Sequence, residues 1–276
     1  SYVEFQRHYK GNENPYYRLE RLAGWGSGSS EALGTLPSMS GWQQSTIDAE
    51  NSRHSTLHEN LGRVGATWIH RLRLPNRTWM NFSASLPVDR HVRHLYYHRN
   101  SVVYTPEHTA TLFSPELVWK WNLSCDDRNG ERTQLVLNYL SESSAPDMLN
   151  LLGIRDAADP LNIFLGNPNL QNTRTQTLKA TYRNVWRKSG ILWNFYGDYK
   201  QLSHAIAMGS VYDRSTGVRT YRPENIEGNY EWNGMSGLQL ALDSAKNWEF
   251  ELRANYNYLH SRDLNSDAAH LSAQPS

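Results

Sequence analysis

The sequence predicts an all-β protein, an antiparallel up-and-down meander of long strands that forms part of a transmembrane β-barrel. Alternation is clearest in residues 248–258, where apolar or aromatic side chains hold every even position and polar ones every odd position. Several such segments run beyond about 12 residues, whereas strands of soluble proteins most often have about 5 or 6. Tight turns also alternate with long connections along the chain, which is typical of membrane barrels.

Alternation, interrupted at Gly, Pro, Asn and Asp, predicts about ten strands. They cover residues 2–9, 16–23, 57–74, 77–97, 108–123, 132–143, 173–187, 191–208, 218–242 and 248–262. Tight turns are expected at residues 75–76, 125–130, 188–190 and 243–247, and long connections at 24–56, 100–107, 144–172 and 209–217. A β-sandwich would mix short and long connections more evenly, so the barrel is favoured.

Two local features refine this map. The connection at 144–172 contains a short predicted helix, with Ser144 as N-cap, Pro146 in its first turn and Gly153 at its end. Three glycines of the strand predicted at 218–242 suggest bulges or bends that help a sheet to curve. They are Gly228, Gly234 and Gly237.

Composition supports a membrane protein that crosses with strands. Only 38% of the 276 residues are hydrophobic, which is few for a soluble sandwich of this length. The 10 Trp and 16 Tyr outnumber the 6 Phe, and these amphipathic rings favour membrane interfaces or sugar-binding surfaces. No run approaches the roughly 18 apolar residues of a transmembrane helix, and barrel strands leave a weaker, alternating signal.

Charge and cysteine content exclude several classes of protein. With 28 basic and 27 acidic residues, no overall field indicates nucleic acid or an acidic partner. Cys125 is the single cysteine, which excludes an internal disulfide framework and a cysteine-based zinc cluster. No signal peptide begins at Ser1 and the chain ends in a polar segment, so both ends are expected to lie within a longer protein.

A family resemblance rests on residues 159–163, Asp-Pro-Leu-Asn-Ile, and on the Gly-Asn-Pro-Asn-Leu motif that follows them, which is Gly166, Asn167, Pro168, Asn169 and Leu170. With the strands after it, this region resembles the barrel of TonB-dependent outer-membrane receptors, and most closely the outer-membrane β-barrel branch of that superfamily. The resemblance covers residues 144–263. We expect the glycine to supply unusual dihedrals, the proline to fix φ, and both asparagines to bond their own backbone.

The resemblance implies that residues 1–276 are one partial barrel domain of the cell outer membrane, without a plug domain and truncated at both ends. Its partners would be outer-membrane lipid, an unknown imported ligand, and TonB acting through a plug domain that this chain lacks. The function implied is ligand uptake or surface binding without catalysis. The alternative is a soluble all-β binding module, in which carbohydrate could be the ligand and the apolar faces would pack on a second sheet.

Polar residues of the predicted lumen face are the candidates for ligand binding. They are Lys179, Arg183, Asp198, Lys200, Glu251 and Arg253. Long loops, including residues 24–56 and 144–172, are expected to choose the ligand.

Other candidate sites have a simpler interpretation, and no cofactor, metal or catalytic group is predicted. His91, His94 and His98, with Arg90, Arg93 and Arg99, are interpreted as an exposed strand end rather than a site for a metal or an anion. Residues 126–131 are oxygen-rich but lack the spacing of a calcium loop. Glu249 and Glu251 lie two residues apart, as on the wet face of a strand, and no hydrolase or nucleotide-binding motif is present.

Aromatic residues gather near the predicted tight turns. Trp119 and Trp121 lie near one turn, Trp186 near another and Trp248 beside a third. This placement favours an interfacial girdle, whereas a sugar-stacking platform would collect its rings in one patch.

Overall fold

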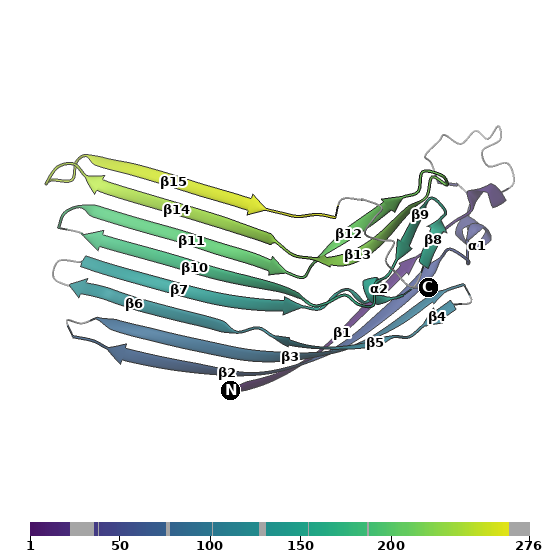
Figure 1. Ribbon diagram of the computed structural model, residues 1–276, viewed down its shortest axis with the longest axis horizontal. Coiled ribbons are helices and arrows are strands. Elements are labelled where there is room, and N and C mark those ends of the chain that lie inside the picture. The colour runs from purple at the N-terminus through teal and green to yellow at the C-terminus, as the bar shows by residue number, and fades with distance from the viewer. Residues whose placement is uncertain are drawn as a thin grey trace. The chain divides into compact units, whose positions relative to one another are not determined.

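The computed structural model describes residues 1–22, 36–37, 39–75, 78–100, 102–126, 131–153, 155–186 and 188–264. Antiparallel strands dominate it (Figure 1). Contacts within the chain define two compact units, one made of Ser1–Glu4, Gly62–Arg90 and Ala110–Ser276, the other of Phe5–Leu61 and His91–Thr109. Among the described residues, no helix has both the length and the apolar run needed to span a bilayer.

The main sheet has eleven strands, and its path confirms the predicted antiparallel meander. Along this path the order is β1-β2-β3-β6-β7-β10-β11-β14-β15, with β4 and β5 paired to β3. The strands are β1 Tyr2–Asn14, β2 Arg53–Arg73, β3 Trp79–Arg99, β4 Val102–Tyr104, β5 Glu107–Phe113, β6 Glu116–Asp126, β7 Glu131–Ser144, β10 Thr173–Trp186, β11 Ile191–Ser203, β14 Asn229–Ala241 and β15 Glu249–His260.

Tight turns and long connections lie at opposite ends of the long strands, as predicted. The turns β2–β3, β6–β7, β10–β11 and β14–β15 are all short, and Figure 1 shows the last three at one end. The long connections contain structure of their own: a short helix, α2 Met148–Leu151, and a second sheet in the order β12-β13-β9-β8. Its strands are β8 Arg155–Asp159, β9 Asn162–Leu165, β12 Ala205–Tyr212 and β13 Arg219–Ile226.

Two predicted long strands are each divided in two. The strand predicted at 191–208 ends at Ser203, because His204 takes a φ of 52° and turns the chain out of the main sheet into β12. The strand predicted at 218–242 is broken at Gly228, whose φ is 96°. No bulge follows at Gly234 or Gly237, since β14 keeps an uninterrupted register with both neighbours.

Three further predictions of local structure are corrected. The strand predicted at 108–123 is interrupted between Phe113 and Glu116, where Pro115 supplies no backbone donor. The strand predicted at 16–23 is instead a short 3₁₀ turn, η1 Leu19–Arg21. The helix α2 begins after Asp147 rather than Ser144, because the Asp147 carboxylate accepts a hydrogen bond from the Leu149 amide at 2.8 Å.

The second unit has its own anchor in the 3₁₀ turn and a short helix, α1 Trp42–Thr46. Arg18 donates to Asp48 at 2.7 Å, and Tyr17 meets Trp42 edge to face at 5.0 Å. Hydrogen bonds from Asn51 and then from Arg18 hold the pKa of Asp48 below its ordinary value. Because Asp48 is 4% exposed, this ion pair fixes the connection between β1 and β2.

The main sheet has two unlike faces, and its register shows which side chains share each face. Directly opposed residues point the same way, so rows can be followed from strand to strand. One row on the apolar face reads Met80, Trp121, Leu135, Tyr182, Phe195, Ser236 and Ala254. The row two residues nearer the loops reads Phe82, Trp119, Leu137, Ala180, Gly197, Gly234 and Tyr256.

In the part of the chain that the structure describes, no second layer covers this apolar face. On β15, Phe250, Leu252 and Tyr256 are 47%, 54% and 61% exposed, which excludes a sandwich core at these residues. Well-buried apolar side chains instead occur in the long connections, as at Met148, Ile163 and Leu170. The apolar face is therefore suited to contact lipid rather than a second sheet.

We expect the two faces to respond oppositely to a charge. Leu135 lies in the middle apolar row of β7, and its neighbour Gln134 lies on the polar face. Leu135→Arg should lower the free energy of unfolding in lipid vesicles by about 2–4 kcal/mol, because the charge would lie near the bilayer midplane. Gln134→Arg should change it by less than about 1 kcal/mol, as a substitution at a hydrated position. Denaturant titration of both variants measures the difference, and equal losses would contradict the assignment of the faces.

Candidate functional site: the polar face and its loops

All six predicted ligand-binding residues lie on the polar face of the main sheet. Lys179 of β10 stands directly opposite Asp198 of β11. Lys200 is opposite both Thr177 and Glu231, so opposite charges face each other in two successive rows. This placement confirms that the alternation identifies the face correctly.

The remaining predicted residues lie nearer the tight turns. Arg183 and Arg253 occupy one row, separated by Asn194 and Gly237. Three strand spacings put their backbones about 14 Å apart, so they flank a strip of wall rather than form one pocket. Glu251 lies one row further toward the turns and binds the guanidinium of Arg253 at 2.6 Å.

Amide side chains link the charged groups along this face. Asn233 donates to Asp198 at 3.1 Å and to Glu231 at 2.9 Å, which connects the two charged rows. Nearer the loops, Arg63 donates two hydrogen bonds to the buried carboxylate of Asp89, at 2.6 and 2.7 Å. The result is a wall of donors and acceptors that can hold a polar ligand by many weak hydrogen bonds.

Sequence reasoning missed a basic hollow at the turn end of β2 and β3. It has a volume of about 560 Å³ and is lined by Arg71, Arg73, Leu74, Thr78, Trp79 and Asn81. The signal was present in the spacing, since residues two apart on a strand share a face. The hollow favours anionic or carbonyl groups, because two guanidinium groups border it.

The Gly-Asn-Pro-Asn-Leu motif ties the β9–β10 connection to two other segments. The amide of Asn167 donates to the carbonyl of Asn150, a residue of α2, at 2.6 Å. Its side-chain nitrogen donates to the carbonyl of Pro223 in β13 at 2.9 Å, and its side-chain oxygen accepts from the Asn169 amide at 3.0 Å. The prediction that asparagine bonds its own backbone is thus confirmed for Asn167.

Gly166 is required for a reason other than the one predicted. Its φ is not in the left-handed region, so unusual dihedrals do not explain it. A Cβ there would instead overlap the carbonyl of Leu152. Pro168 and the buried Leu170 then lead the chain into β10. The motif is a packing contact that fixes where the strand begins.

We expect Gly166→Ala to destabilise the connection between β7 and β10, because the backbone at Leu152 must move to admit the methyl group. The melting temperature in detergent should fall and the β8–β9 region should exchange its amides faster. Gly153→Ala is the matched control, since a Cβ at Gly153 meets nothing within 4 Å and its φ is not left-handed. Equal stability of the two variants would contradict the packing role.

A second ordered loop closes the β12–β13 hairpin. The carboxylate of Asp213 accepts hydrogen bonds from the amide and hydroxyl of Ser215 at 2.8 and 2.7 Å, and from the hydroxyl of Thr216 at 2.8 Å. The hydrogen bonds from Ser215, followed by the one from Thr216, lower the pKa of Asp213 from 3.8 to about 2. The ionised carboxylate therefore organises this hairpin tip.

This depressed pKa predicts a pH dependence of the hairpin. Its stabilisation is fully present above the ordinary pKa of 3.8 and is lost as the pH falls toward about 2. Hydrogen exchange in residues 205–226, corrected for its intrinsic pH dependence, should differ between wild type and Asp213→Asn at pH 6 and converge as the pH falls below about 2. Arg214→Gln, which leaves these hydrogen bonds in place, should follow wild type throughout. A pH-independent difference would contradict the role of the charge.

The histidine and arginine cluster of β3 is spread over two faces. His91 contacts Glu59 at 2.8 Å, and His94 approaches Glu107 at 3.7 Å. Arg93 is buried and contacts His108 at 2.9 Å. In the part of the chain that the structure describes, no group of three metal-ligating side chains converges. Of the oxygen-rich segment 126–131, residues 127–130 lie outside the described residues.

Aromatic residues mark the loop-end rim of the apolar face. One row reads Ala84, Leu117, Tyr139, Leu178, Tyr199, Trp232 and Tyr258. At the other end, Trp186 pairs with Ile191, eight residues further along β10 than Leu178. Eight residues span about 27 Å along a strand, and a tilt of about 40° reduces this to a height of about 20 Å, somewhat less than the usual apolar band of about 25 Å. Trp119 and Trp121 lie within this band and stack at 5.7 Å.

A model of the outer membrane protein beta-barrel family matches residues 113–274, more than half of the chain. The chain belongs to this family. No curated protein matches the chain closely enough to be compared with it. As a member of the outer membrane protein β-barrel family, the chain lies in the cell outer membrane, and its apolar face meets lipid. The polar face is then the inner face of the barrel wall.

Proposed function

We propose that this chain forms the wall of a TonB-dependent receptor-like barrel that binds or imports a ligand without covalent chemistry. The observation that carries the proposal is the charged face opposite the lipid face, where Lys179 and Asp198 lie in one row and Lys200 and Glu231 in the next. A lumen lined in this way holds water and polar solutes. Energy for import would come from TonB through a plug domain.

The loop end supports selection of a ligand at the cell surface. By the general rule for outer-membrane barrels, long connections face outward and short turns face the periplasm. Here the long connections carry the second sheet, α2 and the Gly166–Leu170 motif, so they offer a preformed surface rather than a flexible one. Residues 144–172 are thus well placed to contact a ligand before it reaches the polar wall.

A soluble carbohydrate-binding module is the alternative hypothesis, and fewer observations support it. It would require the even-numbered side chains of β15 to pack on another sheet, but Phe250 and Leu252 are 47% and 54% exposed. Family membership also places the chain in a membrane. The absence of catalysis stays a proposal, supported by the lack of a hydrolase or nucleotide-binding motif in the sequence.

The proposal is tested by uptake in cells that carry the full-length gene. Labelled ferric chelates, cobalamin and oligosaccharides are supplied to cells with and without the gene, with and without functional TonB, and with a protonophore. We expect one probe class to accumulate only when the gene, TonB and the proton gradient are all present. Accumulation that persists without TonB would identify a passive pore and overturn the proposal.

Variants of the wall separate its role from general folding. Replacing both Lys179 and Arg183 by Ala should reduce accumulation at least about tenfold, because two cations of the polar face are lost. Lys188→Ala is the control, since this lysine lies in the tight turn between β10 and β11 and not on the wall. If the double variant accumulated the probe as well as wild type and Lys188→Ala do, the polar face would have no role in uptake.

A further inference from the structure

The lipid-facing surface contains a hollow made by two glycines. Gly197 of β11 stands directly opposite Gly234 of β14, so their row of the apolar face has no side chain on two adjacent strands. The hollow has a volume of about 450 Å³. Neither glycine has a left-handed φ, so the backbone does not demand glycine at either position.

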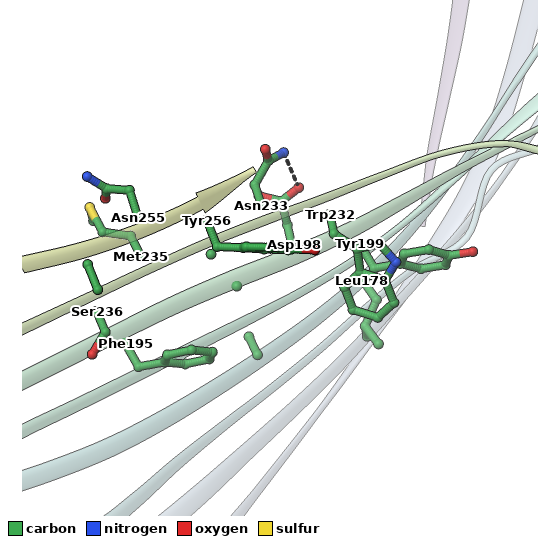
Figure 2. A pocket seen from close by; sticks show the side chains of 14 residues that line it. Leu178, Phe195, Asp198, Tyr199, Trp232, Asn233, Met235, Ser236, Asn255 and Tyr256 are labelled. Carbon is green, nitrogen blue, oxygen red and sulfur yellow. Dashed lines mark hydrogen bonds between the residues drawn. The ribbon is translucent and has the colours of Figure 1, made fainter. Parts of the chain in front are cut away.

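Aromatic and aliphatic side chains enclose this hollow. Phe195, Tyr199 and Leu178 border it from β11 and β10, and Trp232 and Tyr256 from β14 and β15. Figure 2 shows Phe195, Tyr199 and Trp232 on one side of the sheet, with Asn233, Met235 and Asn255 on the other. Trp232 and Tyr199 touch with ring centroids 4.4 Å apart, forming the loop-end wall. The lining is almost wholly apolar, so an apolar chain fits it better than a polar ligand does.

A polar, basic cluster lies directly beyond that wall. Tyr230 stacks on His260 at 4.9 Å and lies 6.0 Å from Tyr258, centroid to centroid. The guanidinium of Arg262 covers Gly228, near Tyr230. Among the described residues, no carboxylate pairs with Arg262, which is exposed. Hydroxyl, imidazole and guanidinium groups therefore meet at the edge of the apolar band, where a phosphorylated headgroup would lie.

We propose that this hollow seats one acyl chain of lipid A, the acylated and phosphorylated glycolipid of the outer leaflet, with a phosphate held beside Arg262 and His260. Three observations select this occupant. The face is already the lipid interface of the barrel. The glycine row lies two residues from the Tyr199–Trp232 row at the loop end of the apolar face, and this end faces outward. The His260 imidazole lies four residues along the strand from the glycine row, about 13 Å away, and the Arg262 guanidinium follows two residues later.

The site is tested on the purified full chain in detergent, with lipid A as the probe. After exchange into lipid-free detergent, bound lipid is quantified by native mass spectrometry. Wild type should retain about one lipid A per chain, and Gly234→Leu should retain at least tenfold less, because the side chain fills the hollow. A Cβ at Gly234 comes no closer than 3.8 Å to Tyr256, so the substitution is sterically tolerated at its base.

The matched control is Gly237→Leu on the same strand, whose Cβ points to the polar face and meets nothing within 4 Å. It should retain lipid A as wild type does. Arg262→Gln should weaken retention of lipid A and leave retention of its dephosphorylated form unchanged. This variant keeps the test valid should Gly234→Leu fail to fold.

Two results would overturn the proposal. One is equal retention of lipid A by wild type, Gly234→Leu and Arg262→Gln. The other is displacement of lipid A by an equal concentration of phosphatidylglycerol, which would show an ordinary annular phospholipid site. Neither result would bear on import through the lumen, because the uptake assay depends on TonB and the polar face.

Discussion

The backbone hydrogen-bond ladder of the main sheet is the constraint from which the rest of the structure follows. In the hydrocarbon of a bilayer, an N–H or C=O without a partner costs several kcal/mol, so a spanning strand must be paired along its length. β10 meets this demand on both sides, because Arg174–Trp186 pair with β11 and Thr173–Val185 with β7 without a break. β15 is paired with β14 on one side, and in a bilayer its other edge requires a further strand.

Once the ladder is fixed, the period of two assigns every side chain to lipid or to water. A single sheet has no interior, so its apolar side chains stay on the surface of the protein, where they contact lipid. This explains how a chain with 38% hydrophobic residues can be a membrane protein. Some polar atoms on the lipid face are paired there, as where the indole nitrogen of Trp193 donates to Ser236 at 3.1 Å.

Alternation made the faces predictable, but it could not reveal where a strand leaves the sheet. His204 and Gly228 interrupt segments whose polarity still alternates, and only their left-handed φ values separate the main sheet from β12 and β13. The Gly166 motif was found from sequence, yet its reason depends on Leu152, which a loop brings near it. The lipid-facing hollow could not be predicted from the sequence for a similar reason, because it forms only when the strand register places Gly197 opposite Gly234. Contacts between distant segments are the part that a one-dimensional pattern does not contain.

The glycine pair also has an energetic consequence. Glycine inside a strand is less favourable than alanine by about 0.5–1 kcal/mol, and here two occur directly opposite each other. Neither a bulge nor a left-handed φ accompanies them, and a Cβ at Gly234 would meet only ordinary contacts. The fold therefore gains nothing locally from glycine at this position. What the missing side chain does provide is room between Phe195, Tyr199, Trp232 and Tyr256, on the face of the sheet that meets lipid. Glycine here lowers the stability of the strand and provides only space for an apolar chain. This is what we expect where the sequence has been selected to bind such a chain.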